Sequence, residues 1–176
     1  MTARLEAGSA ACHYPSGMEG LGAPIMDLDE FAELRPTLGR VVATSGGFDP
    51  IHPGHISCII ESAGFGDVLV VIVNGDSFLT EKKGKPFQDC RTRCLIVSGL
   101  RAVDFVVPFE VPGDPTVSRA LESIRPAVFT KGGDRVDAES IPEWEVCRAI
   151  GTDIVTGVGL SKEWSSSWFL ENWRRG

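Results

Sequence analysis

The chain alternates between short continuous apolar runs and longer segments in which apolar residues recur every three or four positions. The runs are rich in Val, Ile and Phe and end close to Gly, Pro or Asp, which is typical of buried strands. They predict strands at residues 40–44, 67–73, 105–109, 127–130 and 153–156. The periodic segments predict helices at residues 28–35, 55–63, 91–100, 117–124 and 142–150, and a last helix from 165–167 to 172.

This alternation predicts the fold class. Strands that are apolar along their whole length are buried on both faces, and a helix between successive strands allows them to run parallel. We therefore expect an α/β fold of three layers, in which a mainly parallel sheet has helices on both faces. An Asp27-x-x-Glu30 capping pattern starts the first helix. Residues 1–24 are rich in Gly, Ala, Ser and Pro without periodicity, so we expect a flexible N-terminal tail there and one domain over residues 25–176.

The composition is that of an ordinary globular protein. The 176 residues suffice for one domain, and 43% of them are hydrophobic and 23% charged, which argues against a disordered or fibrous chain. Acidic residues outnumber basic ones by 24 to 17, for a net charge of −7. A protein that binds nucleic acid along its surface usually has the opposite balance. We therefore expect no nucleic-acid partner, and an anionic ligand would have to be held by a few local cations and backbone dipoles.

Neither a membrane span nor a secretory signal is expected. The longest apolar run covers residues 68–73, well below the ~18–20 residues that cross a bilayer, and no basic segment followed by an apolar one begins the chain. The five cysteines lie at irregular spacings that do not form a pattern of zinc ligands. We expect reduced thiols, a cytoplasmic location and no metal held by protein side chains alone.

The segment from Gly46 to His55 carries the strongest functional signal. It reads Gly-Gly-Phe-Asp-Pro-Ile-His-Pro-Gly-His, follows the first predicted strand and opens a helix. Ligands bind at such junctions in open α/β sheets, and the free N–H groups and positive end of a helix N-terminus favour phosphate. His52 and His55 are three residues apart, so both imidazoles are directed toward one pocket and can donate to phosphate oxygens. An isolated His pair is more often a solvated helix start or half of a metal site, but the surrounding glycines favour the phosphate site.

In this context the His-x-Gly-His motif resembles the signature of the cytidylyltransferase-like nucleotidyltransferases. Further segments recur in similar order in bacterial heptose-1-phosphate adenylyltransferase domains: Val73-Asn-Gly-Asp76, the lysines at 82–85, Arg93, residues 102–110, Lys131-Gly-Gly-Asp134 and the serines at 165–167. The resemblance implies a Rossmann-like fold and an enzyme that transfers a nucleoside monophosphate from a nucleoside triphosphate, with ATP favoured, to the phosphate of a small acceptor such as a sugar 1-phosphate. Pyrophosphate would be released, and Mg²⁺ would accompany the triphosphate.

The resemblance also implies roles for individual residues. The expected catalytic residues are His52, His55, Lys82, Lys85 and Arg93. The residues expected to bind the nucleotide are Gly46, Gly47, Phe48, Lys131, Gly132, Gly133, Asp134, Ser165, Ser166 and Ser167. Those expected to orient the acceptor are Ser45, Asp49 and Asp76. The attacking phosphate oxygen is already an anion, so such a site needs hydrogen-bond donors and cations rather than a general base.

Several of these residues have a structural alternative. Asp49 is of a type common in turns and caps, the lysines at 82–85 are equally an ordinary solvated charge run, and Arg93 would suit a salt bridge on the helix surface. Residues 131–134 could form only a tight turn, and a single serine of 165–167 would suffice to cap the last helix. The position of the lysines between a strand end and a helix favours a mobile loop that grips phosphate.

Other functions remain as alternatives. A double glycine and three consecutive serines depart from the pattern of the heptose enzymes, so CTP with a phospho-alcohol or an alkylphosphonate is the second choice of substrates. A non-catalytic nucleotide-binding module is disfavoured because both histidines are present, and a redox dinucleotide-binding protein would need a G-x-G-x-x-G motif after the first strand. The aromatic residues Trp164, Trp168, Phe169 and Trp173 are expected to pack on the core, with a homodimer contact as the alternative.

Overall fold

The computed structural model describes residue 20 and residues 22–133, 137–160 and 163–175. Its centre is one five-stranded sheet with the strand order β3-β2-β1-β4-β5, in which every pairing is parallel. The strands are β1 (Val41–Gly46), β2 (Val68–Asn74), β3 (Phe105–Phe109), β4 (Val128–Gly132) and β5 (Asp153–Val158). Because all pairings are parallel, the carboxyl ends of the five strands lie at one edge of the sheet.

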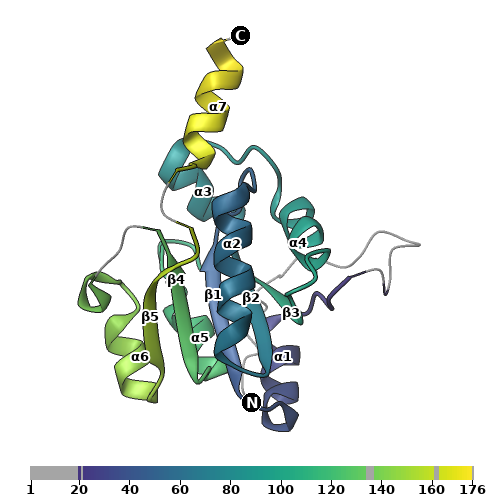
Figure 1. The fold of residues 1–176 in the computed structure, drawn as a ribbon, viewed down its shortest axis with the longest axis vertical. Helices are drawn as coiled ribbons and strands as arrows, with labels where there is room; N and C mark the ends of the chain where they lie inside the picture. Colours follow the sequence, from purple (N-terminus) through teal and green to yellow (C-terminus); the bar gives the residue numbers. More distant parts are fainter. Residues whose placement is uncertain (1–19, 21, 134–136, 161–162, 176) are drawn as a thin grey trace, which may run out of the picture.

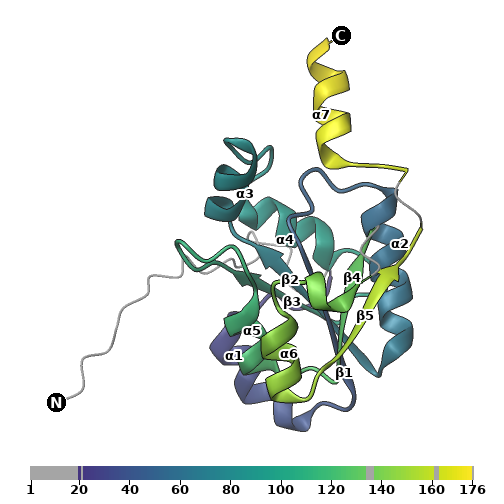
Figure 2. The same ribbon diagram turned by 90° about the vertical axis from the view of Figure 1, so that its left-hand side faces the viewer.

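Helices cover both faces of this sheet (Figures 1 and 2). The helices are α1 (Leu28–Leu34), α2 (Pro53–Ser62), α3 (Asp76–Lys83), α4 (Cys90–Ser98), α5 (Ser118–Ile124), α6 (Trp144–Ile150) and α7 (Ser166–Arg175). α2 and α4 pack on one face, and α1, α5 and α6 pack on the other. The predicted three-layer, Rossmann-like α/β fold is confirmed, and the capping box of Asp27 and Glu30 starts α1 as the sequence indicates.

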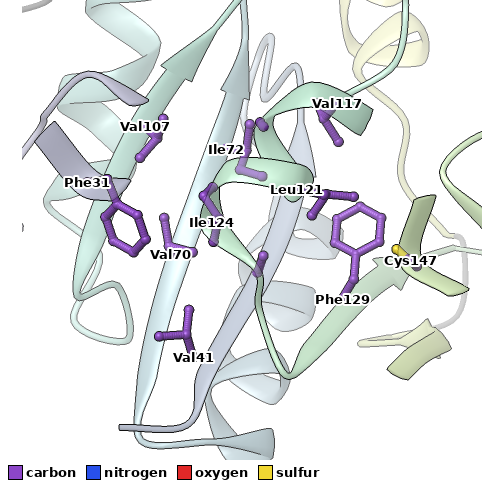
Figure 3. Close-up of a cluster of buried hydrophobic side chains, with 12 residues drawn as sticks. Phe31, Val41, Val70, Ile72, Val107, Val117, Leu121, Ile124, Phe129 and Cys147 are labelled. Atoms are coloured by element: carbon purple, nitrogen blue, oxygen red, sulfur yellow. The ribbon is translucent and has the colours of Figure 1, made fainter. Parts of the chain in front are cut away.

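The central strands are apolar throughout because each face of the sheet has its own hydrophobic core. Figure 3 shows the core on the α5 side, where Val70 and Ile72 of β2 lie beside Leu121 and Ile124 of α5. Along the chain, β2 and then β3 are added on one side of β1, and β4 then pairs with the other side of β1. The strand order therefore reverses between β1 and β4, and ligands of open α/β sheets bind at the carboxyl edge beside such a reversal.

One helix, α3, is not predicted from the sequence. It holds few apolar residues, and its N-cap, Gly75, offers no side chain to cap it, so neither an amphipathic period nor a start signal is visible. Lys82 and Lys83 lie in its last turn. The expectation that the lysines form a loop is therefore wrong for these two, and only the segment that begins at Gly84 leaves the helix.

The last helix, α7, projects away from the sheet (Figures 1 and 2). None of its residues in the described part of the chain is buried, and Trp168 and Trp173 are 53% and 75% exposed. Core packing is therefore the wrong expectation for these two side chains, whereas Trp164 and Phe169 are half-buried. The physical reason is that α7 contacts the domain through its first turn, where Ser166 Oγ donates to the carbonyl of Pro50 over 2.9 Å, and then runs outward.

Contacts with the domain begin before α1. The N–H of Ala23 donates to the carbonyl of Ser98, and the N–H of Met26 donates to the carbonyl of Val106. The packed chain thus starts a few residues earlier than the capping pattern at Asp27 suggests. Within the part of the chain that the structure describes, no helix is long and apolar enough to cross a membrane.

Four cysteines lie in the described ranges. Cys94 and Cys147 are buried, and Cys58 and Cys90 are half-buried. The sulfur atoms of Cys90 and Cys94 lie 4.0 Å apart on α4. Two of the four described cysteines are thus buried, and the reduced state of the thiols stays a prediction.

Candidate active site at the carboxyl edge of the sheet

His52 and His55 meet at the N-terminus of α2, just beyond the carboxyl end of β1. His52 is the N-cap of the helix and has an extended backbone, and His55 lies in the first turn. Their rings stack with the centroids 3.7 Å apart and the planes inclined by 22°. The prediction that this spacing directs both imidazoles to one place is confirmed.

Both histidines keep an unused hydrogen-bonding atom. Nδ1 of each ring is buried and has no hydrogen-bond partner among the described residues. Phe48 packs edge-on against His55, with centroids 5.2 Å apart, and the ring of Phe169 from α7 lies 6.2 Å from that of His52. A buried polar atom without a partner costs free energy, and such atoms call for a functional explanation. Here a ligand at the helix N-terminus would supply the missing partners.

Burial makes both histidines weaker bases. Desolvation lowers the pKa of His52, and desolvation together with the charges of His52, Lys82 and Lys83 lowers the pKa of His55 to about 3. At neutral pH His55 is therefore an uncharged imidazole that donates one N–H. An anionic ligand would oppose these effects and raise the pKa of His55 when it binds.

The low pKa of His55 predicts a loss of stability in acid. The pKa is about 3 in the folded chain against a model value of 6.5, so between these values the unfolded state binds more protons and the free energy of unfolding falls as the pH falls. Between pH 6.5 and 4.5 the wild type should lose about 2 kcal/mol more than a His55→Asn variant. Urea unfolding at each pH measures this difference, and equal pH slopes for the two proteins would contradict it.

The two glycines before the histidines lie in close contact with neighbouring side chains. A Cβ on Gly46 would lie 3.0 Å from the ring of Phe48, and a Cβ on Gly47 would lie 2.8 Å from a methyl group of Leu79 in α3. Phe48 itself is 5% exposed and has a positive φ of 51°. The glycines thus allow Phe48 to fold back under the turn, where it supports the ring of His55.

Asp49 ties the segment after α3 to the histidine turn. Its side chain is 2% exposed and accepts hydrogen bonds from the N–H groups of Phe87 and Gln88, each over 2.8 Å. Lys83 forms an ion pair with the same carboxylate and also donates to the carbonyl of Asp49 over 2.6 Å. These contacts match the turn role that the sequence leaves as the alternative for Asp49. They occupy both carboxylate oxygens of Asp49, the residue that was expected to orient the acceptor.

A change of Asp49 should therefore affect stability. Asp49→Asn keeps the shape of the side chain but removes its charge. It also places an amide N–H₂ group, which cannot accept a hydrogen bond, next to the N–H groups that the carboxylate binds. We expect the free energy of unfolding to fall by about 1–2 kcal/mol, measured by urea denaturation. The exposed variant Asp29→Asn is the matched control and should change it by less than about 0.5 kcal/mol. A urea midpoint for Asp49→Asn equal to that of the wild type would show that these contacts of Asp49 do not contribute to stability.

Arg93 is fully buried, so it does not form the surface salt bridge that was its structural alternative. Its Nη1 donates to the carbonyls of Gly47 and Asn74 over 2.7 and 2.6 Å, its Nε to the carbonyl of Gln88 over 3.0 Å, and its Nη2 to the carboxylate of Asp76 over 2.6 Å. Four of the five N–H groups of the guanidinium are thus engaged by the protein. Arg93 holds together the ends of β1 and β2 and the segment before α4, and Asp76 is its partner.

The predicted lysines surround this edge of the sheet. Lys82 lies 5.8 Å from the centroid of the Phe78 ring, and its charge contributes to the low pKa of His55. Lys85 lines a groove of about 440 Å³ between residues 83–87 and α7. Lys83, which the sequence did not single out, forms the ion pair with Asp49.

The three serines around the start of α7 reach the same edge. Ser165 Oγ accepts a hydrogen bond from the N–H of Trp168 over 3.1 Å, which is the capping role expected of one serine. Ser166 Oγ binds the carbonyl of Pro50 within the histidine turn. Ser167 lines the groove beside Lys85. The structure therefore brings the serine segment next to the histidines, although the two segments are far apart in the sequence.

Lys131 and Ser45 meet on the opposite side of β1. Lys131 Nζ donates to Ser45 Oγ over 3.0 Å and forms an ion pair with Glu143 over 3.4 Å. Of the glycines that follow, Gly133 has a positive φ of 89°, as a tight turn requires, and a Cβ on Gly132 would lie 2.9 Å from the sulfur of Cys58. Asp134, which was expected to bind the nucleotide, lies outside the described residues.

Two polar residues of this edge, Asn74 and Glu143, were given no role from the sequence, although Asn74 belongs to the segment Val73-Asn-Gly-Asp76. Asn74 is 9% exposed and Glu143 4% exposed. Asn74 carries a weak signal, because it is a polar residue that ends a long apolar run. Glu143 has none, because its burial depends on how α6 packs against α5 and β4.

Comparison with curated proteins places the chain in a family. Residues 43–163 match the model of a family described as cytidylyltransferase-like. The chain is 35% identical over 169 residues to the bifunctional protein HldE of Streptomyces coelicolor, which covers 93% of this chain and 33% of that protein. It is 37% identical over 122 residues to the HldE of Azorhizobium caulinodans, which covers 68% of this chain and 23% of that protein. The chain thus spans about a third or less of these relatives.

Solved structures agree with the fold. A lipopolysaccharide core biosynthesis protein from Thermoplasma volcanium GSS1 superimposes with a TM-score of 0.59 at 28% identity, over 70% of this chain and 99% of that one. A pantoate-beta-alanine ligase from Francisella tularensis gives a TM-score of 0.56 at 15% identity, over 81% of this chain and 68% of that one, and this likeness shows the fold alone. Together with the family match and the His-x-Gly-His turn at the start of α2, these similarities show that the chain belongs to the cytidylyltransferase-like family.

Proposed function

We propose that this chain is a nucleotidyltransferase domain, which transfers a nucleoside monophosphate from a nucleoside triphosphate to the phosphate of a small acceptor and releases pyrophosphate. The observation that carries the proposal is the stacked pair of His52 and His55 at the N-terminus of α2, each with a buried and unpartnered Nδ1 among the described residues. N–H donors and the positive end of a helix favour a phosphate group. Membership of the family supports the same class of reaction.

In the proposed reaction an oxygen of the acceptor phosphate attacks the α-phosphorus. A bond from that oxygen to phosphorus forms, and the bond from the α-phosphorus to the bridging oxygen of the pyrophosphate breaks. The attacking oxygen is an anion, so the protein contributes orientation and stabilisation of negative charge. His52 and His55 would donate N–H groups to the phosphates, Lys82 would add positive charge beside them, and Arg93 would hold the ends of β1 and β2 in place.

Mg²⁺ would enter with the triphosphate in this proposal. Among the residues that the structure describes, no three His, Cys, Asp or Glu side chains are grouped to hold a metal ion. The phosphates and water would therefore supply most of the ligands, as is usual for Mg²⁺ bound to nucleotides. The ion would neutralise charge on the triphosphate, and no carboxylate of the chain is assigned to it.

ATP and a sugar 1-phosphate are the proposed substrates. The structural neighbour from T. volcanium, at 28% identity, is named as a protein of lipopolysaccharide core biosynthesis, and that name includes a saccharide product. The resemblance of the residues at 73–76, 82–85 and 131–134 to heptose-1-phosphate adenylyltransferase domains points the same way.

Pyrophosphate release, assayed with ATP and CTP separately, tests the proposal. Each nucleotide should be offered with sugar 1-phosphates, with a phospho-alcohol and with an alkylphosphonate. We expect turnover with ATP and a sugar 1-phosphate. Turnover with CTP alone would overturn the choice of nucleotide, and turnover with only the non-sugar acceptors would overturn the choice of acceptor. Turnover with none would overturn the reaction class.

A further inference from the structure

A row of polar side chains lies on the α5 and α6 face of the sheet at its carboxyl edge. Asn74 ends β2, Ser45 lies near the end of β1 and Lys131 lies near the end of β4, and these three strands are neighbours. Alternate residues of a strand share a face. Asn74 therefore follows Ile72, and Lys131 follows Phe129, on the face whose core includes α5 and α6.

Glu143, the N-cap residue of α6, contacts Lys131 at one end of this row. It is 4% exposed, and its Oε1 accepts from Lys131 Nζ and from the N–H of Val117 at the start of α5, both over 3.4 Å. Lys131 in turn donates to Ser45 Oγ. The polar row is therefore a built arrangement that connects the strand edge to two helices.

Two buried oxygen atoms in this row lack a partner. Oδ1 of Asn74 and Oε2 of Glu143 are buried and make no hydrogen bond to any described residue. Both atoms are acceptors, so a ligand that satisfies them must donate hydrogen bonds. An ionised phosphate has no hydrogen to donate, whereas hydroxyl groups donate readily. Asn74 also lines a hollow of about 10 Å³ together with Thr116 and Val117, which is room for roughly one water-sized group such as a hydroxyl.

We infer that Asn74 and Glu143 bind hydroxyl groups of a sugar ring, and that this sugar is the acceptor's. The inference rests on the proposed function. The triphosphate side of the edge is the α2 side, where His52 and His55 lie and where Ser166 and Phe169 of α7 approach them. The α5 and α6 side is thus left for the second substrate. The ribose of the nucleotide is the other hydroxylated ring in the reaction, and the test separates the two.

The test compares Asn74→Ala and Glu143→Gln with the wild type in the pyrophosphate-release assay. The matched control is Glu145→Gln, which makes the same change at an exposed position of α6. With D-mannose 1-phosphate as acceptor, each site variant should raise the acceptor KM about tenfold, as expected for one lost hydrogen bond to a sugar hydroxyl. The KM for ATP should stay within about twofold. 2-Aminoethylphosphonate, which has no sugar ring, should inhibit the wild type and both variants with the same inhibition constant.

A second measurement separates binding from folding. Asn74→Ala removes an unpartnered buried atom, so it should leave Tm unchanged or raise it, whereas a structural role for Asn74 would lower Tm and raise both KM values. A rise in the KM for ATP alone would assign the site to the ribose and overturn the inference, as would an unchanged acceptor KM. Should the wild type turn over no acceptor, the proposed function fails. Calorimetric titration of D-mannose 1-phosphate then decides this inference: binding weakened about tenfold by Asn74→Ala supports it, and no binding to the wild type or equal binding overturns it.

Discussion

Replacing His55 by alanine is expected to lower kcat for pyrophosphate release by about 10²- to 10³-fold, the usual loss for one donor that stabilises charge in a transition state. His55 lies in the first turn of α2, stacked on His52 and supported edge-on by Phe48. Its position is therefore fixed before a substrate arrives, and that fixed placement makes such a donor effective. The loss should fall mainly on kcat, because the hydrogen bond strengthens as negative charge grows on the phosphate oxygens.

Steady-state assays at saturating nucleotide and acceptor measure this loss. Ile60→Ala is a suitable control, because Ile60 lies on the same helix and is 59% exposed. Its kcat should match the wild type. His55→Asn keeps a side-chain N–H donor close to the position of Nδ1 and should recover part of the activity. Undiminished turnover in His55→Ala would show that the proposed mechanism is wrong. A wild type that binds ATP but turns over no acceptor would instead support a non-catalytic nucleotide-binding module.

The fold was largely predictable because its strands carry strong local signals. β2 and β3 are continuous apolar runs bounded by polar or turn-forming residues, and such runs are typical of buried strands. α3 was not predictable, because its sequence DSFLTEKK has no apolar face and no capping side chain. It is a helix because Leu79 is buried under the turn at Gly47. That contact joins residues more than thirty positions apart and leaves no trace in a local pattern.

The candidate site was predictable in part, because local spacing brings some of its residues together and distant segments bring together the others. The convergence of His52 and His55 follows from their spacing on one helical turn, so it could be inferred from the sequence. The burial of Asp49 and Arg93 could not, because a charged residue in a sequence is expected at the surface. Each is buried only because backbone groups from distant segments supply its partners: Phe87 and Gln88 for Asp49, and Gly47 for Arg93.

Replacing Arg93 by methionine is expected to lower the free energy of unfolding by about 3–5 kcal/mol, the range for breaking a buried charged network by removing one partner. The guanidinium is completely buried, and its loss leaves three carbonyl groups without their donor, those of Gly47, Asn74 and Gln88. The carboxylate of Asp76 would lose less, since its side chain is 41% exposed and can be hydrated instead. Most of the cost should therefore come from the carbonyl groups at the ends of β1 and β2, which water cannot easily reach.

Urea denaturation followed by circular dichroism measures this loss, with Arg91→Met as the matched control. Arg91 lies on the same helix but is exposed, so its removal should change the free energy of unfolding by less than about 0.5 kcal/mol. Arg93→Lys should fall between the two, because a compact ammonium cannot reach four acceptors that a planar guanidinium spans. Wild-type stability in Arg93→Met would mean that the turn at Gly47 is held by other contacts. Because that turn leads directly into His52, the loss of Arg93 should also lower kcat in whatever fraction of the variant remains folded.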